Sequence, residues 1–153
     1  VRGSMATLRE KIGASAEEWL NLPPGVPASK ELARYKRFLK IENNRLRLLH
    51  NNGAGGLELC RARSFVMDEL VRHLVATALA GVDDPALVRK HPVAVVAYGG
   101  YGRGELNPLS DVDLLFLHGG EAVVGRRPNA LLTAVTDTVL YTFWDLGLKV
   151  GHA

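Results

Sequence analysis

Apolar residues recur every three or four positions through the first half of the chain, a spacing typical of amphipathic helices. One helix is predicted from an N-cap at Ser29 to about His50, with Glu42 interrupting its apolar stripe. A second is predicted over about residues 57–80. Because only six loop residues join the two helices, we expect an antiparallel helical hairpin over residues 28–80.

The segment before this hairpin has a weaker pattern. Residues 6–20 fit a short helix, which the proline-rich stretch 21–27 must end, because proline lacks a backbone N–H and disfavours helix in the residue before it. Residues 1–4 (VRGS) resemble the remnant of an expression tag and are set apart from the fold. We therefore expect residues 1–27 to be loosely attached.

The apolar runs become shorter in the second half, which predicts strands together with one helix. After a linker over residues 81–92, we expect a buried strand, a glycine-rich turn, a second strand, a loop, a helix and a third strand. The corresponding ranges are Val93–Ala97, Gly99–Gly104, Asp111–Leu117, His118–Pro128, Asn129–Asp145 and Leu148–Gly151. Pro128 suits the first turn of the helix and Gly147 its end. The fold class is thus α+β, with a core at residues 92–153.

Two features between the first two strands indicate a site for a metal-bound nucleoside triphosphate. The glycines leave the backbone almost free of Cβ atoms, so that a bulky anion can approach the N–H groups of Gly99 and Gly100. Asp111 and Asp113 start the second strand. Because strand side chains alternate between faces, both should point the same way, roughly 7 Å apart at their Cα atoms. Such a pair can hold a divalent cation.

Each feature alone has a simpler interpretation. A glycine cluster is more often a turn than a phosphate site, and an Asp-x-Asp pair is often a solvated strand start. Arg103 is either a phosphate contact or the partner of Glu105 or an aspartate, and Ser110 either binds phosphate or caps the start of the strand. The combination is more specific, because two like charges beside an apolar strand repel each other unless a cation joins them.

Composition sets broad limits on the function. A chain of 153 residues with 47% hydrophobic content can bury the core of one domain. The net charge of +3 is too small to indicate a nucleic-acid partner. The basic residues are concentrated in the first long helix, where they form either a solvated face or a surface that attracts triphosphate or an acidic partner.

The cysteine count and the hydropathy indicate a soluble cytoplasmic protein. The single Cys60 excludes an internal disulfide and fits a reducing compartment, where it should pack as a small apolar residue. No apolar run approaches the ~18 residues that span a bilayer, so we expect no membrane partner.

The sequence from Gly99 to Leu115, GGYGRGELNPLSDVDLL, resembles the signature of nucleotidyltransferases of the DNA polymerase beta type. Within that superfamily it is most similar to the bacterial uridylyltransferase and uridylyl-removing enzymes that modify the PII nitrogen-signalling protein. The flanking stretches that share the resemblance are Lys40–Gly56, Arg61–Leu70 and Tyr141–His152. It covers about residues 30–153 and implies a polymerase beta-like core, a short mixed sheet with flanking helices, preceded by the helical hairpin.

The resemblance also implies an activity, the transfer of UMP from UTP to a tyrosine hydroxyl of PII with release of pyrophosphate. Asp111 and Asp113 would be the catalytic pair that holds Mg²⁺, or Mn²⁺ in its place. The residues that would contact the nucleotide are Gly99, Gly100, Arg103 and Ser110.

The chain departs from the family pattern in two respects. Members of the superfamily generally use a third acid, often on the next strand, but residues 148–152 (LKVGH) contain none. The hydrolase domain that removes the uridylyl group and the glutamine-sensing regulatory domains are not present in the sequence. We therefore interpret the chain as part of a nucleotidyltransferase and leave its own activity and its oligomeric state open.

Two other functions remain as alternatives. One is a different nucleotidyltransferase that transfers AMP to a protein or small molecule, and the other is an inactive nucleotide-binding module. Preference for UTP over ATP separates the first from the uridylyltransferase, and loss of metal binding in Asp111→Asn and Asp113→Asn separates the second. A nucleic-acid polymerase fits less well, because no series of stacking aromatic residues accompanies the basic ones.

Overall fold

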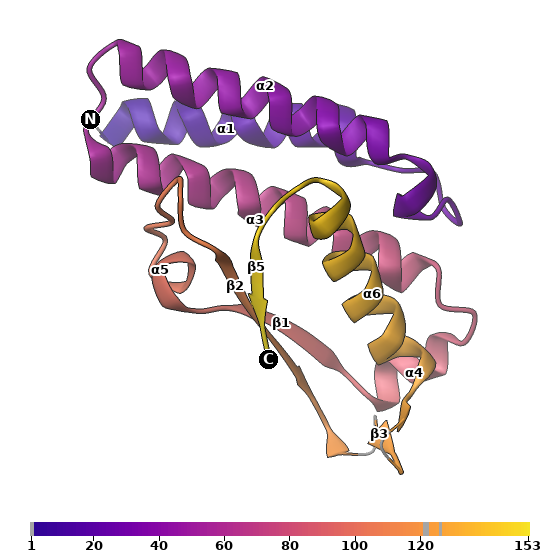
Figure 1. Ribbon diagram of the computed structural model, residues 1–153. Helices are drawn as coiled ribbons and strands as arrows, with labels where there is room; N and C mark the ends of the chain where they lie inside the picture. Colours follow the sequence, from indigo (N-terminus) through magenta and orange to yellow (C-terminus); the bar gives the residue numbers. More distant parts are fainter. Residues whose placement is uncertain (1, 121–122, 126) are drawn as a thin grey trace.

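The computed structural model describes residues 2–120, 123–125 and 127–153. Three long helices form a layer on one side of the molecule (Figure 1). They are α1 (Arg2–Leu20), α2 (Leu32–Asn51) and α3 (Gly56–Ala80). A small sheet and a further helix, α6 (Ala130–Asp145), lie on the other side of α3 (Figure 1). Of the described helices, none has both the length and the apolar character needed to cross a bilayer.

Helix α1 is an integral part of this layer, which corrects the expectation that residues 1–27 are loosely attached. Its buried side chains recur every four residues, and Ile12, Ala16 and Leu20 are at most 1% exposed. They join the main hydrophobic core together with residues of α2 and α3. The physical reason is that these three positions form one stripe along the helix, and α2 and α3 pack against this stripe and bury it.

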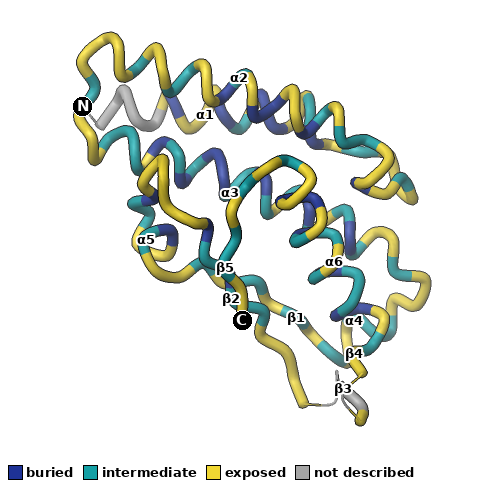
Figure 2. The backbone as a smooth tube through the Cα atoms, viewed as in Figure 1, coloured by how far each residue is buried: buried dark blue, intermediate teal, exposed yellow. Residues whose placement is uncertain are grey.

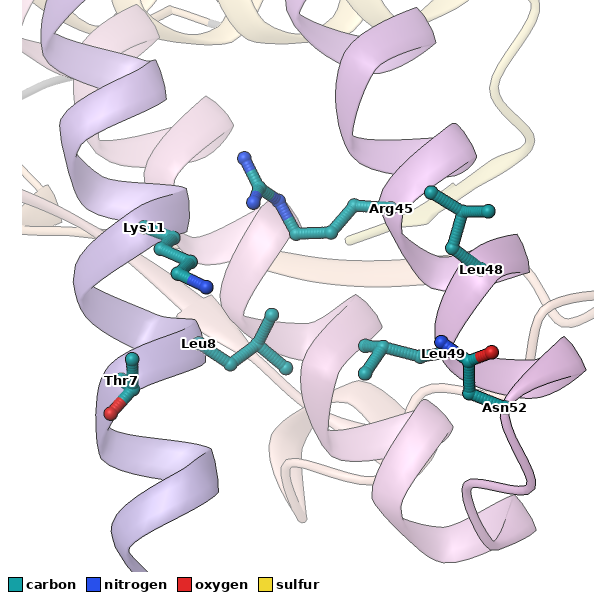
Figure 3. Close-up of a pocket in the computed structure, with 7 residues that line it drawn as sticks. All are labelled: Thr7, Leu8, Lys11, Arg45, Leu48, Leu49 and Asn52. Carbon is teal, nitrogen blue, oxygen red and sulfur yellow. The ribbon is translucent and has the colours of Figure 1, made fainter.

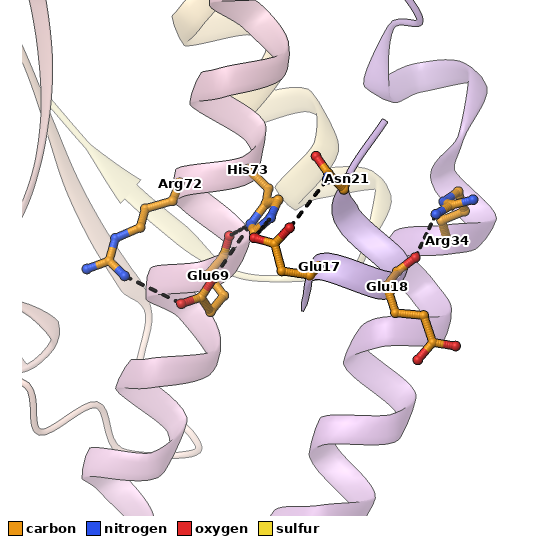
Figure 4. Close-up of polar contacts among 7 residues, drawn as sticks. All are labelled: Glu17, Glu18, Asn21, Arg34, Glu69, Arg72 and His73. Atoms are coloured by element: carbon orange, nitrogen blue, oxygen red, sulfur yellow. Dashed lines mark hydrogen bonds and ion pairs between the residues drawn. The ribbon is translucent and has the colours of Figure 1, made fainter. Parts of the chain in front are cut away.

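Polar contacts also fasten the end of α1 to both neighbouring helices (Figure 4). Arg34 on α2 donates hydrogen bonds to the carbonyl oxygens of Glu18 and Trp19, at 2.8 and 2.9 Å. On α3, the His73 ring lies 3.7 Å from the Glu17 carboxylate. The carbonyl groups left unpaired at the end of a helix thus find donors on the next helix. As predicted, α1 stops before the proline-rich stretch 21–27.

The chain enters α2 through a 3₁₀ turn, η1 (Ala28–Lys30), so Ser29 is not the N-cap that the sequence predicts. The N–H of Lys30 donates to the carbonyl of Pro27 at 3.1 Å and closes this turn one step before the helix. The N-cap position falls to Glu31, whose side chain makes no capping bond. The short loop between α2 and α3 folds them back on each other, and the predicted hairpin is confirmed (Figure 1).

Glu42, the acid within the apolar stripe of α2, is completely buried. Arg45, one turn later, donates to its two carboxylate oxygens at 2.8 and 3.3 Å. This two-bond contact compensates for the removal of the carboxylate from water. The interruption seen in the sequence is therefore an ion pair within the helix, not a break in the core.

The predicted linker over residues 81–92 contains a short helix, α4 (Pro85–Lys90). Asp84 caps it by accepting the N–H of Ala86 at 2.9 Å, and Pro85 occupies a position where a missing N–H costs nothing. The start signals are therefore present in the sequence. With only six residues, the helix is too short to show an apolar period.

Three strands form a mixed sheet in the order β1-β2-β5. They are β1 (Val93–Ala97), β2 (Val112–His118) and β5 (Val150–His152). Strand β2 pairs antiparallel with β1 and parallel with β5. The predicted α+β class and the order of strand, turn, strand, helix and strand are confirmed, with β2 beginning at Val112, one residue later than expected.

Burial changes from residue to residue along β1 and β2 (Figure 2). Val112 and Leu114 are each 1% exposed and belong to the core that includes α3. On the opposite face, Val96 and Leu117 are 37% and 49% exposed. Strand β1 is thus half-buried, not the fully buried strand that was expected. Because side chains alternate, Asp113 lies on the exposed face.

Helix α6 begins at Ala130, one residue later than predicted, and ends at Asp145 as predicted. The side chain of Asn129 accepts a backbone N–H at 2.8 Å and is the N-cap. Gly147 adopts a φ of +74° just after the helix, a conformation that favours glycine. Because Asn129 takes the N-cap, Pro128 stays outside the helix instead of in its first turn, as part of β4 (Arg127–Pro128), which pairs with β3 (Val123–Val124).

Candidate active site

The glycine-rich turn leaves the end of β1 through a single helical turn, α5 (Gly99–Gly102). Gly99 has a φ of +62°, which redirects the chain out of the strand and is strained for any residue with a Cβ atom. Gly102 is constrained by space, since an added Cβ would lie 2.7 Å from the carbonyl oxygen of Ala97. The N–H groups at the start of such a turn have no partner within it, so those of Gly99 and Gly100 are available to an anion.

Helix α3 holds this turn in place through two contacts that the sequence alone did not reveal. The Tyr101 hydroxyl, on a side chain that is 5% exposed, donates to the Asp68 carboxylate at 2.9 Å. The backbone N–H of Leu106 donates to the Ser64 hydroxyl oxygen at 3.0 Å. Burial, followed by the nearby Asp68 charge, raises the pKa of the Tyr101 phenol, which therefore stays a hydrogen-bond donor over the usual pH range.

The Asp113 side chain lies between two glycines, Gly99 and Gly151, which have no Cβ atom. A Cβ built on Gly99 would lie 2.7 Å from its Oδ2, and one built on Gly151 would lie 2.5 Å from its Oδ1. Gly151 faces Asp113 across the β2–β5 pair, and the N–H of Tyr98 donates to the Asp113 carbonyl at 3.1 Å. The sheet thus places Asp113, and two glycines from different elements leave room for its carboxylate.

Asp111 has a different environment, although it precedes Asp113 by only two positions. It is exposed, directly before the first residue of β2. No hydrogen bond or ion pair among the described residues involves its carboxylate, so both oxygens are open to a ligand. The strand alternation, which buries Val112 and Leu114, puts Asp111 on the same side as Asp113.

The other predicted nucleotide contacts have partners of their own. The Nε of Arg103 lies 3.8 Å from a Glu105 oxygen, with the arginine side chain 69% exposed. The hydroxyl of Ser110 donates to the carbonyl of Asn107 at 2.9 Å and helps to close the turn before Asp111. The structure thus shows the Arg103–Glu105 pair that the sequence left as one of two options, while phosphate contacts by Arg103 and Ser110 stay predictions.

A separate hollow of about 380 Å³ lies between α1 and α2 (Figure 3). Lys11 and Arg45 reach toward it, and Leu8 and Leu49 form its apolar side (Figure 3). None of the predicted nucleotide or metal residues lines this hollow, and it contains no carboxylate. It belongs to the helical layer and not to the site.

The chemistry of the two aspartates fits Mg²⁺ or Mn²⁺, which prefer oxygen ligands and take water and phosphate as further ones. Gly99 and Gly151, which border Asp113, lack the Cβ atoms that would clash with its carboxylate. Among the described residues there is no group of three acidic, histidine or cysteine side chains that could hold a metal ion. Within the part of the chain that the structure describes, Asp111 and Asp113 are therefore candidate ligands without a third such side chain beside them.

Comparison with known proteins identifies the class of domain. Residues 85–146 match the family model of the nucleotidyltransferase domain. The match runs from α4 through β1, the glycine turn and β2 to α6, and therefore contains Asp111 and Asp113. Fold and match together define the class: the chain carries a nucleotidyltransferase domain with a polymerase beta-like fold.

Curated relatives narrow the class further, because they are named bifunctional uridylyltransferase/uridylyl-removing enzymes. The relative from Phenylobacterium zucineum is 37% identical over 95% of this chain and 15% of its own length. Those from Rhodospirillum rubrum and Caulobacter vibrioides are 40% and 42% identical over 71% and 67% of this chain, and over 11% and 10% of their own lengths. The chain thus spans only 10–15% of these relatives. No solved structure matches it.

Proposed function

We propose that this chain is part of an enzyme that transfers UMP from UTP to a tyrosine hydroxyl of a PII-type signalling protein, with release of pyrophosphate. The nucleotidyltransferase domain supplies the reaction class, and the names of the relatives supply the uridylyl group. The PII acceptor and its role in cytoplasmic nitrogen regulation follow from the resemblance of the glycine-rich signature and its flanks.

The residues of the chain have separate tasks in this proposal. Gly99 and Gly100 offer backbone N–H groups to the β- and γ-phosphates, on a turn that has few Cβ atoms to keep an anion away. Asp111 and Asp113 hold Mg²⁺. When bound, the metal lowers the cost of the negative charge that develops on the phosphates and activates the attacking oxygen.

The position of the Asp113 carboxylate is the observation that carries the proposal. It lies on the exposed face of the sheet, next to the glycine turn, with each of its two oxygens in space that a Cβ on Gly99 or Gly151 would fill. An aspartate that only pointed into solvent at the start of a strand would not require glycine at both neighbouring positions. Electrostatic catalysis requires charged groups such as this carboxylate to be in position before the substrate binds.

Incubation of the complete gene product that contains this chain with PII protein, Mg²⁺ and either UTP or ATP tests the proposal. We expect the mass of PII to rise by one uridylyl group with UTP, and the Asp113→Asn variant to abolish this. Labelling from ATP in preference to UTP would instead identify an adenylyltransferase. A lack of transfer from either nucleotide, with nucleotide binding retained, would identify an inactive binding module.

A further inference from the structure

A basic groove runs along α2 on the side that faces the loop before β5. Its larger part has a volume of about 1070 Å³ and a smaller adjoining part about 340 Å³. The two parts share Asn43, Arg47 and Arg63, so they form one continuous depression. We call this depression the basic groove.

The charged residues that line the basic groove are all cationic. They are Lys36, Arg37, Lys40, Arg47 and Arg63. None of them takes part in an ion pair among the described residues. A concave surface lined by one sign of charge concentrates ligands of the opposite sign.

Arg63 gives a second indication that the groove suits an acidic ligand. Its Nε atom is buried and has no hydrogen-bond partner among the described residues. Burial lowers the pKa of its guanidinium, because the surroundings disfavour the charge. A buried donor without an acceptor is costly, and an acidic group in the groove would satisfy it.

The rest of the groove lining indicates the kind of ligand. Between the cations, the surface consists largely of apolar side chains, including Leu39, Ile41, Leu46, Leu59 and Leu148. Neither part is lined by Phe, Tyr or Trp, and His50 alone does not provide the series of platforms on which nucleic-acid bases stack. A protein segment that carries both acidic and apolar side chains matches this surface better than a nucleic acid does.

The groove also leads to the candidate active site. One end reaches Pro108, in the turn that Ser110 closes directly before Asp111. The other end reaches residues 146–148, which lead into β5 and so to Gly151 beside Asp113. A protein bound along the groove would therefore lie next to the strand ends that carry the aspartates.

We propose that the basic groove is the docking surface for an acidic and partly apolar segment of the protein acceptor. This inference rests on the proposed function, because it assumes that the acceptor is a protein. Docking along α2 would bring the acceptor hydroxyl to the nucleotide and raise the rate of encounter through charge attraction.

Charge reversal of two exposed lysines tests the docking surface. In the complete gene product, Lys36→Glu/Lys40→Glu should raise KM for PII on the order of tenfold, because docking charges act mainly on association. The neutral pair Lys36→Gln/Lys40→Gln should give a smaller increase. The matched control is Arg89→Glu/Lys90→Glu on α4, which changes the net charge equally at exposed residues outside the groove, and should leave KM for PII unchanged.

The outcomes separate the docking surface from the proposed function. If the wild type labels PII from UTP but all three variants keep its KM for PII, the groove is not the docking surface, while the function stands. Equal increases in the groove variant and in the α4 control would likewise overturn it. Should the groove variant lose single-stranded RNA binding and keep its KM for PII, the groove binds nucleic acid instead. If the wild type labels no PII from UTP, the function fails and the docking surface fails with it.

Discussion

The glycine-rich turn with Asp113 and the basic groove along α2 are two candidate binding regions whose side chains are held in opposite ways. At the turn, contacts with neighbouring elements fix the position: the Tyr101 hydroxyl donates to Asp68, and the Asp113 carboxylate lies against Gly99. In the groove, Lys36 and Lys40 are exposed and unpaired among the described residues, so charge and not position dominates there. The difference suggests that chemistry needs the first arrangement, because small displacements of reacting groups are costly, and that recruitment needs only the second.

The largest effects should come from the aspartates themselves. Asp113→Asn should lower the transfer rate on the order of 10³-fold and Asp111→Asn on the order of 10²-fold, since only Asp113 is placed by its surroundings. The measurement is kcat with UTP and PII. Asp137→Asn, an exposed acid on α6, is the control and should keep the wild-type rate. An Asp113→Asn enzyme with more than a tenth of that rate would contradict the assignment.

A smaller loss should follow when the space beside Asp113 is filled. Gly99→Ala puts a Cβ 2.7 Å from the carboxylate and should lower kcat roughly 10²-fold, because a shift of an ångström in a reacting group has about that effect. It should also lower the free energy of unfolding by about 1–2 kcal/mol through its positive φ.

Gly104→Ala separates these two effects. Gly104 has a similar φ of +69°, but an added Cβ there meets nothing within 4 Å. We expect the same loss of stability as for Gly99→Ala and little loss of kcat. If both variants lose kcat equally, the contact with Asp113 is not what matters and backbone strain explains the result.

Removing the contacts that hold the glycine-rich turn to α3 should mainly lower the free energy of unfolding. Tyr101→Phe leaves the Asp68 carboxylate without its donor and should lower the free energy of unfolding by about 1–2 kcal/mol at pH 8. Chemical denaturation measures this difference. A matched removal of the second anchor, Ser64→Ala, leaves the Leu106 N–H unpaired and should cost a similar amount.

The pH dependence of this difference has a definite sign. Burial and the Asp68 charge raise the pKa of Tyr101 in the folded state, while in the unfolded state it is about 10. Above pH 10 the folded state binds more protons than the unfolded state, so the wild type loses stability with rising pH. By pH 11 its advantage over Tyr101→Phe should shrink by about 1.4 kcal/mol. An advantage that grows with pH would show that the phenol ionises in the folded protein.

The smallest effects are expected at Arg103, an exposed cation beside the rigid turn. Its pair with Glu105 spans 3.8 Å in solvent, so Arg103→Ala should change the free energy of unfolding by less than about 0.5 kcal/mol. If Arg103 contacts phosphate, its loss in Arg103→Ala should raise KM for UTP roughly tenfold, equivalent to about 1.4 kcal/mol. Glu105→Gln breaks the same pair without removing the cation, and an equal rise in KM there would assign the effect to the pair.

The sequence predicts those parts of the site that local rules determine. The β-branched run of β1, the glycine turn and the Asp111–Asp113 spacing are each readable within a few residues. The anchors are not, because Tyr101 and Asp68 are 33 positions apart, and Leu106 and Ser64 are 42 apart. An aspartate or a serine on a helix looks the same in the sequence whether it faces solvent or another element.

The fold shows the same limit. Gly147 marks the end of α6 by its own backbone preference, and that prediction is confirmed, whereas the start signal assigned to Pro128 is wrong because the Asn129 side chain caps the helix. The stripe of α1 contains alanine and has few large apolar side chains, so its burial depends on α2 and α3, which the local pattern does not include. Likewise, the N-cap of α2 moved past Ser29 because the turn after Pro27 takes up that residue.

The central claim is that Asp111 and Asp113 together bind a metal ion with the nucleotide, and the most direct measurement is Mn²⁺ binding followed by electron paramagnetic resonance in the presence of UTP. For the wild-type chain and for Asp137→Asn, the account predicts that UTP and Mn²⁺ bind together, with the free-Mn²⁺ signal reduced. For Asp111→Asn/Asp113→Asn it predicts no reduction beyond that caused by UTP alone. An unchanged reduction in the double variant would show that the metal-bound nucleotide is held elsewhere and would contradict the account.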